Sequence, residues 1–517
     1  MLKSNRRQAL LIGTSGILLA GSGKFLRAMA ATPKAGGSVA IAIGGAPPTL
    51  DAQMTSASYA RDISLHIFET LYARDENGRS VPDLAEGVEV KDDGKTYVFA
   101  LRKGVKFHNG KEMKSEDVVA SLERYRKIGA SAKLIEVIDT IKATGPYEVT
   151  IGLKNVLGSF LDRLSSPRSP LAIYPAEEAT KPPDQLKIVG TGPYRFVEYV
   201  PDSHVKLERF ADYAQNMAYS GRDGYAGRKE AFLDEVTFRF MPDGGAKLAA
   251  LQAGEVQFIE DTDGRSANSL DKEKFKVYKA IPFYIEALKF NHAQPPTNDV
   301  HFRRAVSAAL NMEAIMSIAY SDIYTLDGGW VFPTSPYASK EGLDLYNIAN
   351  IEAAKEELAK SNYQGENLTF IVENYQPDVD AATVIKEQLG QIGINVDVRP
   401  ADWPTVSKIG FTHDDWHMWV HGMGIEPYEG PATIMSVWVN GESQQKDDPV
   451  INKLFADYNL ELDEAKRKDI FGAFQKHMYE DAVATPVAQY GLFQVATSKL
   501  QNFVPARIPR MWGVWLE

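Results

Sequence analysis

The stretch from Ile67 to Arg124 constrains the fold of this chain most, because it predicts a compact unit of strands followed by a helix. Tyr97, Phe99 and Leu101 alternate with less apolar residues, which is the period of a half-buried strand. Asp93-Gly94 lies between this strand and a shorter apolar run, and glycine accepts the positive φ that a tight turn requires. The pattern therefore predicts a β-hairpin.

A helix is predicted shortly after this hairpin. Ser115 precedes two acidic residues, which suit the positive end of a helix. Val118, Leu122 and Tyr125 then follow on one helical face. The stretch is thus an αβ module, and its physics alone assigns no function to the chain.

Four runs of this module also carry a resemblance to a known family. The runs are Val81–Glu86, Asp92–Tyr97, Leu101–Gly110 and Glu116–Val119. Their order and sequence resemble the family 5 extracellular solute-binding proteins of ABC importers, the group that includes dipeptide-, oligopeptide- and nickel-binding proteins. A match this long and without gaps is far more specific than a short motif.

The resemblance implies an α/β fold, that of a two-lobed periplasmic binding protein of type II-like architecture with an extra subdomain in the first lobe. It implies a protein that captures a solute between two lobes and delivers it to an inner-membrane ABC permease with a cytoplasmic ATPase. It also implies a monomer without catalytic activity, cofactor or bound metal.

Two later landmarks extend the resemblance. Gly190–Phe196 reads GTGPYRF, and its glycines also suggest a phosphate loop. No GK[ST] follows and the next element reads as a strand, so we interpret this run as a tight turn. The third landmark, Phe290–Asn311, matches the helix that opens the second lobe of the family.

Hydrophobic periodicity predicts further elements outside these landmarks. Strands are predicted at Val256–Ile259, Leu368–Val372 and Ile394–Arg399, and helices at Ala246–Glu255, Ala381–Ile392 and Glu464–Asp481. Gly254 and Gly393 mark the ends of the first two helices. The second lobe is therefore expected to be α/β.

The chain has 517 residues, more than one hydrophobic core usually supports, so several domains are expected. Combined with the family resemblance, the segments predict a discontinuous first lobe, an inserted subdomain and a second lobe. The expected bounds are 36–71, 185–285 and 491–517 for the first lobe, 72–184 for the subdomain, and 286–490 for the second lobe.

Residues 1–30 read as an export signal. Basic residues precede an apolar run from Ala9 to Ala20, and Ala28-Met29-Ala30 is the small-x-small pattern of a cleavage site. The run Asn5–Leu11 resembles a twin-arginine signal, although Ala9 stands where that pattern favours Phe. We expect cleavage after Ala30 and Tat export to the periplasm, with Sec export as the alternative and an uncut membrane anchor as the less favoured one.

The net charge limits the classes of partner that this protein can bind, and the lack of cysteine excludes several kinds of site. Removal of the signal removes five basic residues and no acids, so the net charge changes from −11 to −16. An acidic protein disfavours nucleic acid and anionic membrane surfaces as partners. The sequence contains no cysteine, which excludes disulfides, thiolate metal sites, thiol catalysis and a lipobox.

The richest candidate for a ligand site is the segment His413–Met423, HDDWHMWVHGM. As a strand it would place His417, Trp419 and His421 on one face and Trp416, Met418 and Val420 on the other. One face is expected in the core and the other in the cleft. The predicted ligand-binding residues are Trp330, Trp403, Trp416, Trp419, His417, His421, Gly422, Met423, Glu426 and Tyr428.

The nature of the ligand is less constrained. Peptide binders of this family hold the ligand's amino group with an Asp just before an Asp-Pro pair. Glu426-Pro427 stands at that place here and no Asp precedes it, which argues against an ordinary peptide unless Glu426 or Glu429 serves instead. The tryptophans suit an oligosaccharide or an opine-like conjugate, because sugars stack on indole rings.

The sequence favours other classes of function less than solute binding. His413, His417 and His421 suggest a nickel-type metal or metal chelate, but positions four apart on a strand are about 13 Å apart, too far to share one ion. Asp414 and Asp415 point to opposite faces of a strand, and no HExxH, GxSxG or SxxK motif appears, so an enzyme is not expected. A periplasmic peptide chaperone or chemoreceptor adaptor would share the fold.

Overall fold

Two long antiparallel strands, β14 (Phe275–Phe290) and β19 (Ala484–Thr497), run through the main sheet and connect its two ends. The computed structural model describes residues 32–411, 415–424 and 430–517. Residues 34–517 form one compact unit, and only Thr32 and Pro33 of the preceding unit are described. The predicted export signal and its cleavage site therefore lie outside the described residues.

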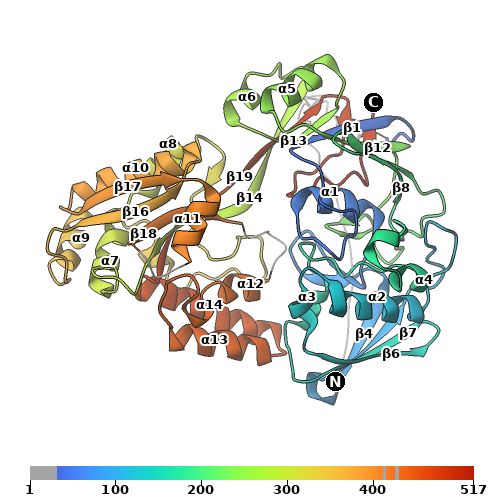
Figure 1. The fold of residues 1–517 in the computed structure, drawn as a ribbon, viewed down its shortest axis with the longest axis horizontal. Helices are drawn as coiled ribbons and strands as arrows, with labels where there is room; N and C mark the ends of the chain where they lie inside the picture. Colours follow the sequence, from blue (N-terminus) through green and yellow to red (C-terminus); the bar gives the residue numbers. More distant parts are fainter. Residues whose placement is uncertain (1–31, 412–414, 425–429) are drawn as a thin grey trace, which may run out of the picture. The chain divides into compact units, whose positions relative to one another are not determined.

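The main sheet is built from strands that lie far apart in the sequence. Besides β14 and β19 it contains β1 (Ser38–Ile43), β8 (Tyr194–Val200), β9 (His204–Arg209), β12 (Glu235–Phe240), β13 (Phe258–Thr262), β15 (Tyr324–Thr325), β16 (Asn367–Glu373), β17 (Asn395–Ala401) and β18 (Met418–Met423). Within the described residues their order is β17-β16-β18-β14-β19-β13-β1-β12-β9-β8, and β15 pairs with β19. In Figure 1, β14 and β19 run from the region of β13 towards β16 and β18.

The stretch from Ile67 to Arg124 contributes two strands to a separate sheet. This sheet consists of β4 (Ala85–Lys91), β5 (Thr96–Leu101), β6 (Ile138–Gly145) and β7 (Glu148–Leu153), in the order β4-β5-β7-β6. The hairpin prediction is confirmed, since Gly94 at the turn has a φ of 90° and the three alternating residues of β5 are buried. The helix prediction is confirmed by α2 (Ser115–Ile128), in which the Asp117 carboxylate accepts the backbone N–H of Lys114.

Three short two-stranded sheets and the remaining helices complete the described part of the unit. The sheets pair β2 (Tyr72–Arg74) with β3 (Ser80–Pro82), β10 (Arg222–Asp223) with β11 (Ala226–Gly227), and β20 (Leu500–Gln501) with β21 (Trp515–Leu516). The helices are α1 (Ser58–Ile67), α3 (Phe160–Leu164), α4 (Ala176–Ala179), α5 (Gly244–Ala253), α6 (Gly264–Asn268), α7 (Val300–Ala309), α8 (Met312–Ala319), α9 (Ile351–Leu358), α10 (Gln376–Gly390), α11 (Trp403–Gly410), α12 (Pro431–Ser436), α13 (Pro449–Leu460) and α14 (Glu464–Glu480). Among the described residues, none of these helices has the length and apolar character to cross a membrane.

The periodic segments form the predicted elements, although some bounds differ: α10 begins at Gln376, five residues before the predicted start at Ala381. β16, α10 and β17 realise the strand, helix and strand predicted between 368 and 399, and the two strands are parallel. The strand predicted at Val256–Ile259 begins instead at Phe258. The reason is the end of α5, because Gly254 adopts a left-handed φ of 78° and the N–H of Val256 bonds back to the Ala250 carbonyl.

Apolar side chains gather in several cores. One packs β4–β7 against α2 and α3, and another packs β1, α1, β9 and β12 with the chain end from Leu500 to Val514. A third packs β16, β18 and the adjacent half of β14 against α7, α8 and α10, and a fourth lies under α12, α13 and α14. β14 and β19 therefore connect regions that each have a core of their own.

The GTGPYRF run makes a close backbone contact, which its glycines permit. A Cβ added at Gly190 would lie 2.1 Å from the Ile67 carbonyl oxygen. The Gly192 N–H donates to that same carbonyl at 2.8 Å, and the Thr191 hydroxyl donates to buried Glu69 at 2.9 Å. Strand β8 follows this run, as the interpretation as a tight turn predicted.

Candidate functional site

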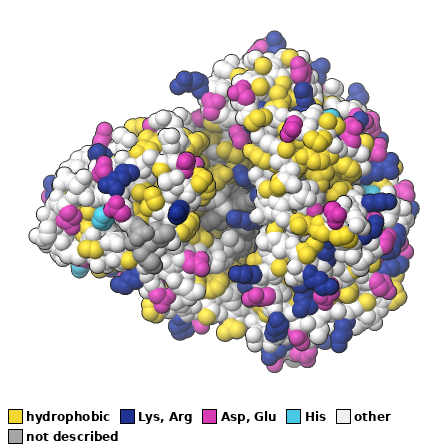
Figure 2. Space-filling model, viewed as in Figure 1, with side chains coloured by type: hydrophobic (Ala, Val, Ile, Leu, Met, Phe, Trp, Pro, Cys, Tyr) yellow, Lys and Arg dark blue, Asp and Glu magenta, His cyan; other side chains and the backbone are white. Residues whose placement is uncertain are grey.

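A hollow of about 520 Å³ is enclosed by residues from distant parts of the chain. Its lining residues are Arg168, Tyr284, Glu373, Tyr375, Asp378, Trp403, His421, Gly422, Met423, Gly424, Thr433, Val437, Tyr490 and Leu492. A volume of this size and a mixed aromatic and charged lining are typical of a small-molecule site. We call this hollow the cleft, and Figure 2 shows the surface hollowed in the region between α11 and α1.

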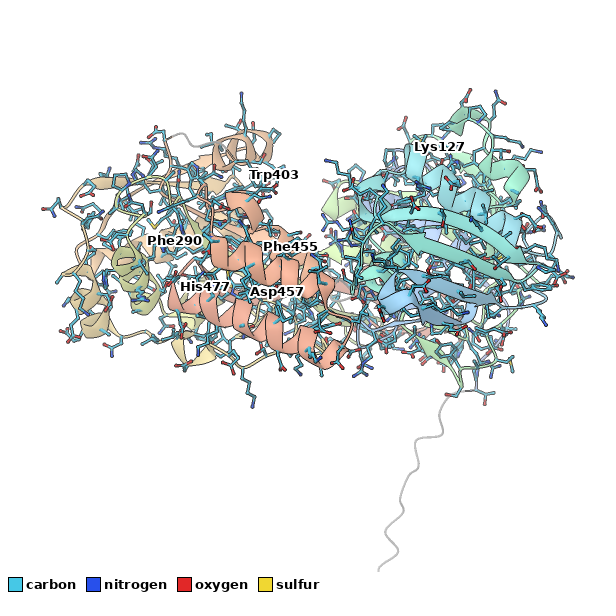
Figure 3. All side chains as sticks on the ribbon, turned by 90° about the horizontal axis from the view of Figure 1, so that it is seen from below. Lys127, Phe290, Trp403, Phe455, Asp457 and His477 are labelled. Carbon is cyan, nitrogen blue, oxygen red and sulfur yellow. The ribbon has the colours of Figure 1, made fainter. Side chains whose placement is uncertain are left out.

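One wall of the cleft is aromatic and comes from α11 and β18. Trp403 is the first residue of α11 and is 44% exposed. The His421 ring stacks on the indole of Trp419 at 4.2 Å between centroids, and Trp403 lies 6.1 Å from both rings. Figure 3 shows Trp403 at the edge of its part of the molecule, on the side that also carries Phe455 of α13. Two of the predicted residues, Trp403 and His421, thus line the cleft. Trp419 packs against both of their rings and does not line the cleft itself.

Three predicted tryptophans lie in the core instead, because Trp419 is fully buried as well and does not line the cleft. Trp330 is fully buried among α12–α14 and packs edge-on against Trp438 at 5.5 Å. Trp416 is also fully buried and meets Trp419 edge-on at 6.4 Å. Because β18 begins only at Met418, the alternation predicted for 416–421 does not reach Trp416, which packs with Trp419 rather than with Met418 and Val420.

Of the other predicted residues, two line the cleft, one does not, and two lie outside the described residues. Gly422 and Met423 line the cleft, and a Cβ at Gly422 would lie 1.9 Å from the Tyr490 hydroxyl, so glycine leaves room for that phenol. His417 does not line it, because its Nδ1 accepts the Thr369 N–H at 3.0 Å. Glu426 and Tyr428, together with His413, Asp414 and Glu429, lie outside the described residues.

The buried charge next to the aromatic wall is unusual. Lys289 on β14 places its Nζ 4.3 Å from the Trp419 ring centroid and is 1% exposed. Burial lowers the pKa of Lys289 to about 7. Burial, and then the charge of Lys289, lower the pKa of His421 to about 3, so this imidazole is neutral at physiological pH. The wall is therefore aromatic and nearly uncharged at the His421 end.

An acidic group lies at another side of the cleft. Asp378, in the first turn of α10, lines the cleft and accepts a hydrogen bond from the Tyr320 hydroxyl at 2.8 Å. The same hydroxyl lies 3.3 Å from Oε2 of Glu286 on β14. Burial chiefly, with the charge of Glu373 adding to it, raises the pKa of Asp378 to about 7.

Arginines line the continuation of the cleft. A smaller hollow of about 230 Å³ shares Arg168, Tyr284 and Gly424 with the cleft and adds Arg61 and Arg507. Arg168 donates to the Gly424 carbonyl at 3.3 Å, and the guanidinium of Arg507 lies 5.7 Å from the Tyr284 ring centroid. The combined space therefore offers carboxyl groups in one region and guanidinium groups in another.

Most of these charged residues were not predicted from the sequence. The sequence does mark Glu286 as unusual, since it is a single acid inside the otherwise apolar run Ile285–Leu288. Asp378 follows the carboxyl end of β16, a place where ligands often bind in parallel sheets. Arg168, Tyr284 and Tyr490 had none, because their meeting depends on packing between segments.

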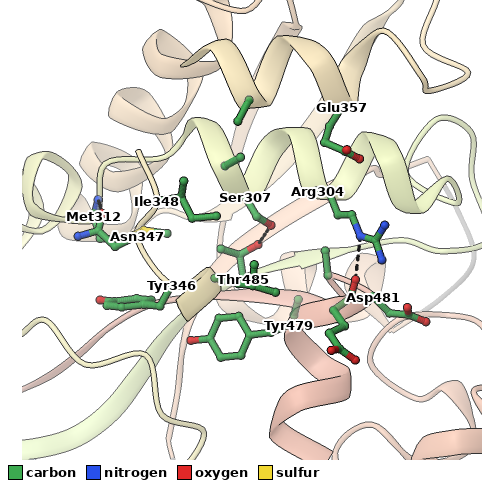
Figure 4. Close-up of a pocket in the computed structure, with 16 residues that line it drawn as sticks. Arg304, Ser307, Met312, Tyr346, Asn347, Ile348, Glu357, Tyr479, Asp481 and Thr485 are labelled. Atoms are coloured by element: carbon green, nitrogen blue, oxygen red, sulfur yellow. Dashed lines mark hydrogen bonds between the residues drawn. The ribbon is translucent and has the colours of Figure 1, made fainter. Parts of the chain in front are cut away.

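Outside the cleft, the described residues also form a second hollow and a cluster of two acids and a histidine. A hollow of about 490 Å³, drawn in Figure 4, is lined only by residues from 304–357 and 479–485, and the Ser307 and Thr485 hydroxyls bond there at 2.6 Å. Asp448, His477 and Asp481 bring potential ligand atoms within 4.8 Å of one another. The Asp448 carboxylate already has hydrogen-bond partners, because it caps the N-terminus of α13 and lies 2.8 Å from His477 Nε2.

Replacing Trp403 with alanine is expected to weaken ligand binding about two- to tenfold while leaving thermal stability nearly unchanged. The reason is that Trp403 is exposed at the cleft and carries little of the core. Phe411→Ala is the matched control, since Phe411 is 57% exposed and touches Trp419 without lining the cleft. Calorimetric titration with the ligand recovered from the protein would measure the affinity of both variants. An equal loss of affinity in Trp403→Ala and Phe411→Ala would contradict the role of Trp403.

Comparison with known proteins agrees with this architecture. Residues 79–445 match the family model described as bacterial extracellular solute-binding proteins, family 5 Middle. The chain is 27% identical to the oligopeptide-binding protein AppA of Bacillus subtilis, over 72% of this chain and 71% of that protein. It is 28% identical to the glutathione-binding protein GsiB of Pectobacterium atrosepticum, over 72% of this chain and 71% of that one.

A solved structure shares the fold along almost the whole chain. The substrate-binding protein CtaP of Listeria monocytogenes superposes with a TM-score of 0.80 at 22% identity, covering 93% of this chain and 100% of that one. The fold is thus the two-lobed α/β fold of periplasmic binding proteins. Because the family model spans most of the sequence, this chain belongs to the family 5 extracellular solute-binding proteins of ABC importers, which bind solutes and are not enzymes.

Proposed function

We propose that this protein is the periplasmic receptor of an ABC importer for a short peptide or a peptide-like zwitterion. The observation that carries this proposal is the distribution of charge over two hollows that share Arg168, Tyr284 and Gly424. Asp378 offers a carboxyl group, Arg168 and Arg507 offer guanidinium groups, and Trp403 and Tyr375 supply aromatic surface. A ligand with both an amine and a carboxylate would pair with both kinds of group.

The alternatives from the sequence are less well supported. A neutral oligosaccharide would leave buried charges without partners when the cleft closes, which costs free energy. Two of the related proteins are named for binding an oligopeptide and glutathione, and both of those ligands are peptides. The missing Asp before Glu426-Pro427 therefore does not exclude a peptide, because Asp378 offers another carboxyl group within the same cleft.

The mechanism is capture rather than reaction. The ligand would shift the protein towards a closed form by its greater affinity for that form, and the permease would recognise the closed surface. The expected export signal and the acidic net charge accord with a periplasmic location. The partners would be an inner-membrane permease with its ATPase, and the receptor would act as a monomer.

The identity of the ligand is tested by mass spectrometry of protein purified from the periplasm without denaturation. Denaturing release is expected to yield an unchanged peptide or amino-acid conjugate that carries both charges. Release of an uncharged sugar would contradict the proposal, and conversion of the ligand on rebinding would indicate an enzyme. Deletion of the gene should abolish uptake of the identified compound; normal uptake would favour a peptide chaperone or chemoreceptor adaptor.

A further inference from the structure

Glu286 is a carboxyl group without a complete set of partners in the core. It lies on β14 between Ile285 and Ala287 and is fully buried. Its Oε1 atom has no hydrogen-bond partner among residues 32–411, 415–424 and 430–517. An unsatisfied buried carboxyl oxygen is costly and is rare in native proteins unless a ligand or water supplies the missing bond.

Glu286 and Asp378 are joined through one phenol. The Tyr320 hydroxyl oxygen lies 2.8 Å from Asp378 Oδ1 and 3.3 Å from Glu286 Oε2. A hydroxyl has one hydrogen, so it donates to only one of the two carboxyl groups. The other group forms its bond to the phenol oxygen only when it carries a proton itself. The geometry therefore favours one proton held by the pair in the free protein.

The electrostatics of the pair agree with this proton count. Burial, and then the negative charge of Asp378, raise the pKa of Glu286 well above its ordinary value. The pKa of Asp378 is raised to about 7, chiefly by burial. Two carboxyl groups this close and this buried do not both ionise unless positive charge arrives.

The pair meets the cleft at Asp378, beside aromatic rings. Asp378 itself lines the cleft, as do Tyr284, Tyr375 and Tyr490. The rings of Tyr284 and Tyr490 stack at 4.9 Å, and Tyr490 lies 4.1 Å from Tyr320. The faces of aromatic rings attract cations, so carboxyl and aromatic groups act in the same direction here.

We propose that Asp378 and Glu286 form a subsite for a cationic side chain of the ligand, one that ends in an ammonium or a guanidinium, and that the pair releases its proton to water when this side chain enters. The proposal rests on the proposed function, since it takes the ligand to be peptide-like and bound in the cleft. Asp378 contacts the cation directly, and Glu286 stabilises it from behind through Tyr320. The exchange is one proton for one cation, and no covalent bond changes.

The neighbouring charges do not replace the pair in this role. The titratable and charged groups on the surrounding elements are Tyr284 of β14, Tyr320 after α8, Glu373 of β16, Tyr375 before α10, His421 of β18, Tyr490 of β19 and Arg168. The pKa values of Tyr320, Tyr375 and Tyr490 are raised, chiefly by burial, and that of His421 is lowered, so these groups stay neutral between pH 5.5 and 8. Glu373, whose pKa burial also raises, is the further acid in this group.

The first test uses the unmodified protein and two matched tripeptides, Gly-Arg-Gly and Gly-citrulline-Gly, which differ in charge and scarcely in shape. Calorimetric titration at pH 7.5 is expected to show about ten- to hundredfold tighter binding of Gly-Arg-Gly. The preference should shrink several-fold at pH 5.5, because Asp378, whose pKa is about 7, is then largely protonated as well and the cation must displace that proton too. Titration in buffers of different ionisation enthalpy should show up to one proton released with Gly-Arg-Gly and none with the citrulline peptide.

The second test assigns the effect to the pair. Asp378→Asn and Glu286→Gln are each expected to abolish the arginine preference and the proton release. Glu313→Gln is the control, because Glu313 accepts the Tyr324 hydroxyl at 2.8 Å and does not line the cleft. Equal binding of the two peptides by the unmodified protein would overturn the subsite and leave the peptide receptor standing. If neither peptide binds, the proposed peptide ligand fails together with the subsite.

Discussion

Replacing Lys229 with methionine is expected to lower the free energy of unfolding by about 3–5 kcal/mol. The Lys229 Nζ lies 3.0 Å from Glu69 Oε1 and 2.9 Å from Asp83 Oδ2, and all three side chains are at most 3% exposed. Although burial raises the pKa of Glu69, the charge of Lys229 lowers it below the ordinary value. Methionine would leave two carboxylates buried without their cation.

The pH dependence of this loss has a definite sign. Without Lys229 the folded protein would hold Glu69 with a pKa above its unfolded value, so the folded state would bind more protons than the unfolded state. The destabilisation should therefore be full at neutral pH and shrink as the pH falls towards 4. Urea unfolding at both pH values measures it.

Lys106→Met is the matched control for Lys229→Met. Lys106 pairs with Asp212 at 2.9 Å, but its side chain is 46% exposed and that of Asp212 60%. Exposed pairs of this kind contribute at most about 1 kcal/mol. If Lys229→Met also lost less than about 1 kcal/mol of unfolding free energy, the buried group of Lys229, Glu69 and Asp83 would not stabilise the fold.

Replacing Gly158 with alanine is expected to weaken ligand binding about ten- to hundredfold, the equivalent of two or three lost hydrogen bonds. Gly158 lies just before α3 and contacts the loop between α13 and α14. Its N–H donates to the Asn459 carbonyl at 2.6 Å, and Arg467 donates to its carbonyl at 3.2 Å. A Cβ at Gly158 would lie 1.7 Å from the Glu461 carbonyl oxygen, so these two backbone segments must separate.

This contact joins the core around β4–β7 to the core beneath α12–α14. It lies beside a hollow of about 430 Å³ that is lined by Ser159 and shares Arg168, Thr433 and Val437 with the cleft. Separation of the two cores should raise the rate of ligand dissociation more than it lowers the rate of association. Gly87→Ala is the control, because a Cβ there meets nothing within 4 Å. Unchanged dissociation in stopped-flow fluorescence would show that the contact has no part in ligand retention.

The elements of the fold were predictable where a pattern is local. Tyr97, Phe99 and Leu101 identify β5 because their alternation is a property of six consecutive residues. The shift of β13 was not predictable, because the bonds of Glu255 and Val256 back to Ala250 depend on the end of α5. The family resemblance supplied the two-lobed architecture, which no periodicity contains.

The cleft was predictable only in part. Trp403, His421, Gly422 and Met423 lie within one short stretch, and the composition of that stretch indicated them. Trp330 has the same residue type but lies in a core, since an indole ring fits either environment. Asp378 and Arg168 meet the same space from segments some two hundred residues apart, and only tertiary packing brings them together.

The two long strands that cross the main sheet have a consequence for anyone who builds a biosensor from this protein. β14 carries Tyr284, and β19 carries Tyr490 and Leu492, so cleft residues lie on the strands that connect the separate cores. Their pairing is irregular between Ala280 and Tyr284, beside Gly491, where a Cβ would lie 1.9 Å from the Ala280 carbonyl oxygen. Redesign of ligand preference on β14 or β19 should therefore alter the amplitude of a fluorescent signal as well, whereas redesign at Trp403 or Tyr375 should change preference alone.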